Sequence, residues 1–107
     1  SQGGTIILAH PYRFAPLIHV DLVRYPPDAI EIRSNNIHID LVQKIEDLAR
    51  SLGLPTACDS DAHVSSAIGR YFNRFDDQYS TQAKILAALR SGDFTHCNEI
   101  EKKTAAF

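Results

Sequence analysis

Two short apolar segments of this chain run directly into side chains that can bind a metal ion, and they constrain the fold more than any other feature. Residues 5–9 lead into His10, and residues 54–58 lead into Asp61 and His63. Continuous apolar runs of this length are typical of strands that are buried on both faces. Alternate residues of an extended chain point to one side, so we expect Asp61 and His63 to project together. The two segments predict a sheet whose strands end in potential metal ligands.

The clearest helix of the sequence lies between these two segments. It follows Asn35 and Asn36, either of which can cap it, and Gly53 stands at the position where glycine usually ends a helix. Its apolar residues recur at steps of three and four, which gives one stripe that can pack on a sheet. The members of this stripe are His38, Leu41, Ile45, Leu48 and Leu52.

Strands and helices alternate along the chain, which favours an α/β fold with parallel central strands and flanking helices. In such folds ligands gather at the carboxyl ends of the strands, where His10, Asp61 and His63 are expected to meet. Residues 71–75 fit either a short strand or an extended loop. The other predicted elements are a helix at 16–23, a strand at 29–32, a helical turn at 65–68, a helix from Ser80 or Thr81 to Arg90 with Ile85, Leu86 and Leu89 inward, and a strand at 94–98.

Composition limits the class of protein. The 107 residues suffice for a single domain, residues 1–107, with a frayed tail at 99–107. The net charge of −2 and the lack of a basic stripe argue against nucleic acid as a partner. No apolar stretch approaches the ~18 residues of a membrane span, and no secretory signal is visible. Cys58 and Cys97 are too few for a disulfide framework, so we expect a cytoplasmic protein without a membrane partner.

Three motifs together resemble the C-terminal half of a PHP (polymerase and histidinol phosphatase) domain. They are Leu-Ala-His-Pro at residues 8–11, Ala-Ile-Glu-Ile at 29–32, and Ser-Asp-Ala-His at 60–63 followed by Ile-Gly at 68–69. The resemblance covers about residues 4–98. It implies the C-terminal portion of a distorted (β/α)7 barrel, similar to a TIM barrel, whose strand ends hold two or three divalent metals. Enzymes of this family hydrolyse phosphoesters.

The resemblance implies that His10, Asp61 and His63 are metal ligands, with zinc, manganese or iron as the metal. It also implies a phosphoester substrate that is hydrolysed by a metal-activated water in a di- or trinuclear centre. No catalytic side chain of the protein can be named from the sequence. A serine nucleophile is not supported, because the chain has no Gly-x-Ser-x-Gly motif.

Further charged residues take supporting roles in this interpretation. Arg13 and Arg70 are candidates to contact phosphate, because a guanidinium binds phosphate oxygens in pairs; the alternative is an exposed, solubilising charge. Glu31 matches a recurrent acidic position of the family and would lie beside the metal ligands, as would Asp59, which can also belong to a solvated turn. A carboxylate in a buried strand needs a partner, and Arg33, Arg13 or Arg70 can supply it.

The chain departs from the family pattern because it has no His-x-His motif and lacks the ligands that follow this motif. It begins with Ser1 and enters a predicted strand within a few residues, so we interpret it as a piece of a larger protein. With an incomplete metal shell, we expect sub-stoichiometric metal and an inactive fragment. The alternative function is a non-catalytic PHP-like scaffold or binding module. An opened barrel exposes strand edges and an apolar face, which predicts a homodimer.

Overall fold

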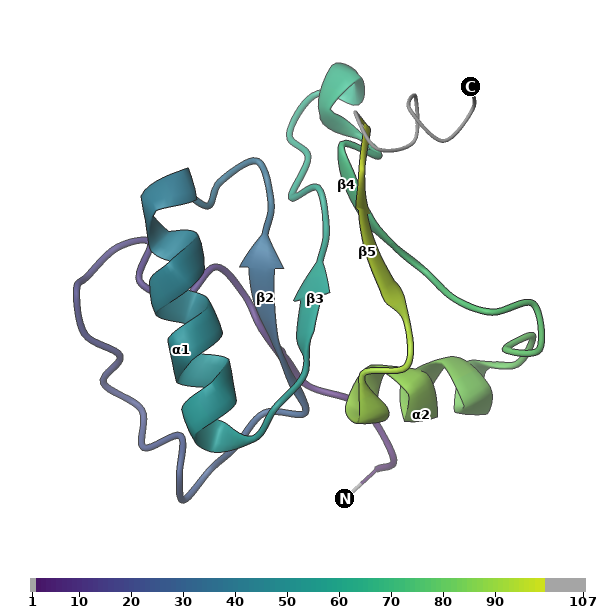
Figure 1. The fold of residues 1–107 in the computed structure, drawn as a ribbon, viewed down its shortest axis with the longest axis horizontal. Coiled ribbons are helices and arrows are strands. Elements are labelled where there is room, and N and C mark those ends of the chain that lie inside the picture. Colours follow the sequence, from purple (N-terminus) through teal and green to yellow (C-terminus); the bar gives the residue numbers. More distant parts are fainter. Residues whose placement is uncertain (1, 100–107) are drawn as a thin grey trace.

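The computed structural model describes residues 2–99, which form two small sheets and two α-helices (Figure 1). The tail predicted at 99–107 lies outside this range, apart from Glu99. Within the described range, no helix combines the length and the apolar character that crossing a membrane requires. The larger sheet and the longer helix lie on one side of the molecule, and an antiparallel hairpin lies on the other (Figure 1).

A three-stranded parallel sheet forms the centre of the protein, as the sequence predicted. Its strands are β1 (Ile7–Leu8), β2 (Ala29–Arg33) and β3 (Thr56–Cys58), and the order in the sheet follows the order in the chain. Each neighbouring pair runs parallel. β2 is the central strand, and four of its five residues are therefore buried. The carboxyl ends of all three strands lie at one edge of the sheet.

The first strand is shorter and more exposed than the sequence predicted for residues 5–9. Only two residues pair with β2, and the side chains of Ile6 and Ile7 are 66% and 39% exposed. β1 is one of the two outer strands of the sheet, and its other edge has no neighbouring strand among the described residues. The prediction that this segment is buried on both faces is therefore wrong. Asp28 holds the segment against β2, because its carboxylate accepts the Ile6 N–H at 2.7 Å.

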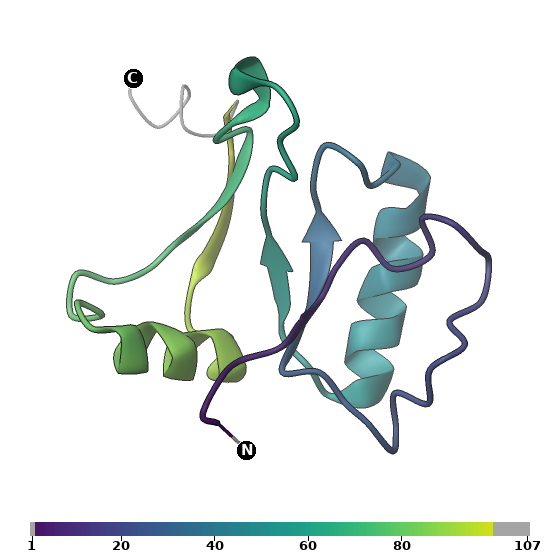
Figure 2. The ribbon, with the colours of Figure 1, turned by 180° about the vertical axis from the view of Figure 1, so that it is seen from behind.

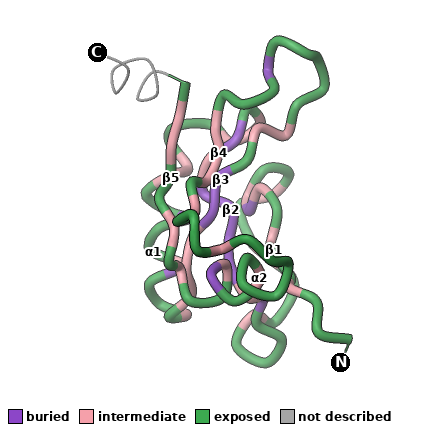
Figure 3. Tube along the Cα trace, turned by 90° about the vertical axis from the view of Figure 1, so that its right-hand side faces the viewer, coloured by how far each residue is buried: buried purple, intermediate pink, exposed green. Residues whose placement is uncertain are grey.

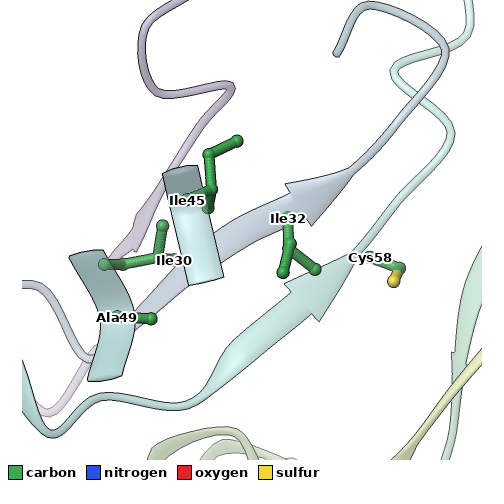
Figure 4. Packing of buried hydrophobic residues seen from close by; sticks show 5 residues of the cluster. All are labelled: Ile30, Ile32, Ile45, Ala49 and Cys58. Carbon is green, nitrogen blue, oxygen red and sulfur yellow. The ribbon is translucent and has the colours of Figure 1, made fainter. Parts of the chain in front are cut away.

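One face of the sheet is covered by α1 (Val42–Leu52). Ile30 and Ile32 of β2 pack against Ile45 and Ala49 of α1, and all four are buried (Figure 4). These positions are two apart on the strand and four apart on the helix, as one face of each element requires. Figure 3 shows that burial is concentrated along β2 and β3. The helix therefore fixes which face of β2 points into the core.

The ends of this helix differ in how well the sequence predicted them. Gly53 ends it as expected, with φ at +66° and its N–H bonded to the last turn. The start is a short 3-10 turn, η1 (Ile39–Leu41), which His38 caps by accepting a backbone N–H at 3.2 Å. The prediction that Asn35 or Asn36 caps the helix is wrong, because their side chains bind the loop after β3. His38 is exposed and lies outside the apolar stripe.

The second sheet is an antiparallel hairpin of β4 (Tyr71–Arg74) and β5 (Thr95–Asn98). A short turn, η2 (Ser65–Ala67), precedes β4, and α2 (Gln82–Ser91) connects the two strands. Thr81 caps α2 through its hydroxyl, which accepts a backbone N–H of the first turn at 3.3 Å. The segment at 71–75 is thus a strand, which decides between the two alternatives that the sequence left open.

Two side chains join this hairpin to the outer edge of β3. The Cys58 N–H donates to Asn73 Oδ1 at 2.9 Å, and Asn73 Nδ2 donates to the Cys58 carbonyl at 2.6 Å. The Nε2 atom of His96 donates to the Thr56 carbonyl at 2.6 Å. The carboxamide of Asn73 thus satisfies the backbone of β3 as a neighbouring strand would. This junction fixes the hairpin beside the carboxyl end of the parallel sheet.

Two helical predictions need correction. Residues 16–23 form a loop that runs past α1 instead of a helix (Figure 2). Asp21 captures the N–H groups of Val23 and the next residue in a single turn, and Val23 is 82% exposed, so this segment has no buried apolar face to stabilise a helix. In α2, Ala88 is buried, whereas Ile85 is 36% exposed rather than inward.

Candidate functional site

The candidate site is a group of polar side chains at the carboxyl end of the parallel sheet. His10 lies two residues after β1, and Asp59 and Asp61 lie one and three residues after β3. Glu31 belongs to β2, between them in the sheet. An extra residue at Ile32 shifts the pairing of β2 with β3 just after Glu31. Such a bulge bends the strand and is common beside functional sites.

Glu31 is the most buried charged side chain at this edge, with 1% of its surface exposed. Its Oε2 atom accepts the backbone N–H of His10, and its Oε1 atom is buried without a hydrogen-bond partner among the described residues. Burial raises the pKa of Glu31 to about 7; the His10 N–H opposes this rise, and the nearby carboxyl group of Asp59 adds to it. None of the arginines predicted as partners contacts Glu31. Its carboxylate instead accepts a hydrogen bond from the backbone N–H of His10.

The contact with Glu31 fixes the backbone of His10 in an unusual conformation. The φ angle of His10 is +23°, in a region that residues other than glycine rarely adopt. Such a conformation is stable only where the surroundings enforce it. Here the hydrogen bond to Glu31 supplies part of that enforcement, and the imidazole ring packs edge-on against Phe14 at 5.8 Å between centroids. The β1 tip therefore presents His10 in one defined orientation.

Asp61 is held in place from both neighbouring loops. Its Oδ2 atom accepts a hydrogen bond from Asn36 Nδ2 at 2.6 Å, and the same oxygen lies 3.5 Å from a guanidinium nitrogen of Arg13. Its N–H donates to Asp59 Oδ1 at 2.9 Å, and its φ angle is +44°. Arg13 follows β1 and Asn36 follows β2, so one carboxylate connects the loops after all three strands. The side chain of Arg13 therefore ties Asp61 to the loop that follows β1.

His63 lies on the solvent side of this cluster. It is exposed, and its Nδ1 atom lies 3.0 Å from the carbonyl of Asp61. Because a carbonyl oxygen only accepts hydrogen bonds, Nδ1 carries the hydrogen and donates it to this bond. Nε2 then keeps the lone pair that a metal ligand requires. The backbone of Asp61 thus orients the imidazole of His63. A hydrogen bond thus joins the histidine of this motif to the backbone of its aspartate.

The sequence interpretation missed the two asparagines that hold this loop. Asn35 Nδ2 donates to the carbonyls of Ser60 at 2.5 Å and Ala67 at 3.3 Å, on either side of the Asp61 motif. Asn36 binds both the carboxylate and the carbonyl of Asp61. The only signal in the sequence was their position at the carboxyl end of a strand, and helix capping accounted for it equally well.

The two arginines that were predicted to contact phosphate lie in different places. Arg13 is part of the cluster, where it forms the ion pair with Asp61. Arg70 follows η2 and lies at the start of β4, where its side chain lines a separate cavity. The structure thus brings Arg13 to the predicted ligands and places Arg70 beside the hairpin.

The donor chemistry of the cluster suits a divalent metal, but its geometry in this chain supplies only part of a shell. Carboxylates and imidazoles are the ligands that zinc, manganese and iron share, and the orphaned oxygen of Glu31 has no other partner among the described residues. Within residues 2–99, however, no three side chains of histidine, cysteine, aspartate or glutamate gather closely enough to hold a metal ion.

The chain is similar to a known protein family. A family model described as PHP-associated matches residues 42–94, which include α1, β3, the Asp61 motif, β4 and α2 and end just before β5. Neither the curated proteins nor the solved structures gave a match. The matched range begins after β2, so the Asp61 motif lies inside it and His10 lies outside it.

Proposed function

From the match of residues 42–94 to the PHP-associated family model, we propose that the chain is part of a metal-dependent phosphoesterase. One observation carries the proposal: Asp61 links the loops that follow three adjacent parallel strands, at the edge of the sheet where α/β enzymes bind ligands. His10 follows β1, and His63 comes two residues after Asp61 in the loop that follows β3. In the proposed function, these three side chains are metal ligands.

The chain's own residues set up this site in several ways. Glu31 fixes the backbone of His10, and Asn36 fixes the carboxylate of Asp61. Arg13 forms an ion pair with that carboxylate. A metal bound to Asp61 would replace this ion pair and leave the guanidinium of Arg13 available to bind phosphate. A bound divalent metal supplies an activated water and neutralises charge on the phosphoryl group. Because the described residues form an incomplete shell, further ligands come from outside them.

We also propose that the open sheet is the C-terminal portion of a (β/α) barrel. The support is the uncovered outer edge of β1, where another parallel strand can pair, together with the exposed Ile6 and Ile7 beside it. A preceding strand at this edge would bring its own carboxyl end to the side of His10. The same proposal places the protein in the cytoplasm, where Cys58 and Cys97 stay as free thiols.

The test uses the longest natural protein that contains this chain. With manganese or zinc added, it should hydrolyse a phosphomonoester, and Asp61→Ala or His63→Ala should lower kcat by at least about a hundredfold. His38→Ala is the matched control, because His38 is an exposed histidine that caps η1 away from the cluster. Full activity of both ligand variants, or an equal loss in the control, would contradict the proposal.

A non-catalytic scaffold is the second candidate. The observation that favours it is that Asp61 already has two partners and that residues 2–99 hold no three-ligand cluster. Titration of this chain with manganese or zinc separates the two candidates. If the chain binds the metal weakly and His10→Ala and Asp61→Asn abolish this binding, the result supports a partial metal site. If neither the chain nor its variants bind metal and the longer protein is also inactive, the result supports the scaffold.

A further inference from the structure

Lys44, an exposed residue of α1, reaches the loop that follows β1. Its Nζ atom donates a hydrogen bond to the Pro16 carbonyl at 2.8 Å, across 28 residues of the chain. The same ammonium group lies 3.9 Å from the centre of the Tyr12 ring. A cation at this distance is attracted by the electrons of an aromatic face. One side chain of α1 therefore holds both ends of residues 12–16, in the loop that runs past the helix (Figure 2).

Residues 12–16 carry two side chains that contact the candidate metal ligands. Arg13 forms the ion pair with Asp61 at 3.5 Å. Phe14 packs edge-on against the His10 ring at 5.8 Å between centroids, and its own ring lies 5.0 Å from the Arg13 guanidinium. The placement of the two ends of this segment therefore decides whether Arg13 and Phe14 reach the candidate site.

The backbone of this loop needs support from outside. The φ angles of His10 and Tyr12 are +23° and +65°, and residues other than glycine rarely adopt such values. The Arg13 N–H donates to the His10 carbonyl at 3.3 Å and closes a turn. Glu31 supports this turn at its start, through the His10 N–H. Lys44 supports it further along the chain, through the Tyr12 ring.

Apolar packing and the ion pair do little to hold this segment. Phe14 and Leu17 are 83% and 69% exposed. The side chains of the Arg13–Asp61 pair are 33% and 26% exposed, and an ion pair that solvent reaches contributes little when the chain must first be ordered. A contact that orders the segment beforehand reduces this entropic cost. Lys44 supplies such a contact from a helix that is packed on the core.

We propose that Lys44 is a positioning residue of the candidate site and acts through residues 12–16. It keeps Arg13 beside Asp61, and it thereby keeps the loop after β1 docked on the loop after β3. The importance of this docking for catalysis rests on the proposed phosphoesterase function. The docking itself needs neither metal nor substrate.

Three variants of exposed lysines test the proposal. Lys44→Met removes the charge but keeps an unbranched side chain that is compatible with a helix, so the chain should still fold. Lys44→Arg keeps a cation that can stack on Tyr12 and donate to the Pro16 carbonyl. Lys84→Met is the matched control, because Lys84 is an exposed lysine on α2.

Amide hydrogen exchange, measured by NMR in EDTA, reports on the backbone of the loop. In Lys44→Met the N–H groups of His10 and Arg13 should exchange about tenfold faster than in the original chain. The N–H of Ile45, whose side chain is buried in the core, should exchange at an unchanged rate. Lys44→Arg should restore slow exchange, and Lys84→Met should not alter it. Equal acceleration at Ile45 would show a general loss of stability and would overturn the proposal.

The His10 imidazole gives a second signal, from the site itself. The ring of Phe14 shifts the proton resonances of His10 at the observed separation, and the loss of these resonances in His10→Ala assigns them. In Lys44→Met this ring-current shift should be lost, whereas Lys44→Arg and Lys84→Met should keep it. An unchanged His10 resonance in Lys44→Met overturns the proposal, and so does an equal change in Lys84→Met.

The longer protein tests the consequence for catalysis. Lys44→Met should raise KM at least about threefold with little change in kcat, because Arg13 then meets the substrate less often while the candidate metal ligands stay in place. Lys44→Arg should restore KM. An unchanged KM in Lys44→Met contradicts a role in catalysis. A longer protein without phosphoesterase activity contradicts the proposed function alone, because the NMR signals are measured without metal or substrate.

Discussion

Replacement of Glu31 by glutamine should stabilise the protein at neutral and higher pH. The carboxyl group of Glu31 is 1% exposed, and its pKa is raised by burial from 4.5 to about 7. Between these values the unfolded chain has lost a proton that the folded chain still holds, so the free energy of unfolding falls as the pH rises. At about 1.36 kcal/mol per pKa unit, the full loss above pH 7 is about 3 kcal/mol. Glu31→Gln removes this loss.

The side-chain geometry allows this replacement. The glutamine carbonyl can accept the His10 N–H as Oε2 does, and its amide group can fill the unsatisfied position of Oε1 beside Asp59. Urea unfolding from pH 4 to pH 9 measures the effect. The variant and the original chain should coincide near pH 4 and differ by about 3 kcal/mol above pH 8.

Glu46→Gln is the control for this measurement, because Glu46 lies on the exposed face of α1 and forms only a surface ion pair with Arg50 at 3.6 Å. It should change the free energy of unfolding by less than about 1 kcal/mol at every pH. An unchanged pH dependence in Glu31→Gln would refute the assignment of the titration to Glu31. A variant less stable at pH 8 than the original chain would show that the carboxylate has a counter-charge.

Two further predictions concern stability and assembly. Asn73→Ala removes the carboxamide that bonds the N–H and the carbonyl of buried Cys58. It should lower the free energy of unfolding, measured by urea unfolding, by about 2–4 kcal/mol. A loss below about 0.5 kcal/mol would contradict the role of Asn73 in joining the hairpin to β3. The uncovered edge of β1 and exposed Ile6 should produce a dimer in sedimentation velocity that Ile6→Lys weakens; a monomer at the highest concentration contradicts this.

The core could be predicted from the sequence because it depends on local pattern. The apolar stripe of α1 has a helical period, and the apolar run of β3 is too short for a helix and is bounded by turn residues, so each favours one kind of element. Gly53 and Thr81 mark helix ends through backbone chemistry that acts within a single turn. The parallel arrangement then follows from the alternation of strands and helices.

The loops could not be predicted in the same way, because their side chains act over long distances in the chain. Asn36 lies 25 residues from Asp61, and nothing near it in the sequence distinguishes a helix cap from a tether. The segment at 16–23 has enough apolar residues for a helix, yet the described chain offers no surface that would bury them. Local preference decides such segments only when tertiary contacts reinforce it.

Glu31 lies in the predictable core strand β2 and also contacts His10 in the loop after β1. Its effect on stability indicates why a carboxyl group occupies this position. A buried carboxyl group in the central strand destabilises the fold at neutral pH, and an apolar residue there would pack without this penalty. What the carboxylate does instead is hold His10 at a φ angle of +23°, which no apolar side chain can do. A residue that lowers stability while it orients a neighbouring polar side chain is typical of a functional site. Because glutamine can still accept the His10 N–H, Glu31→Gln should keep this orientation of His10, whereas an apolar replacement such as Glu31→Leu removes the acceptor and, under the proposed function, should weaken metal binding through His10.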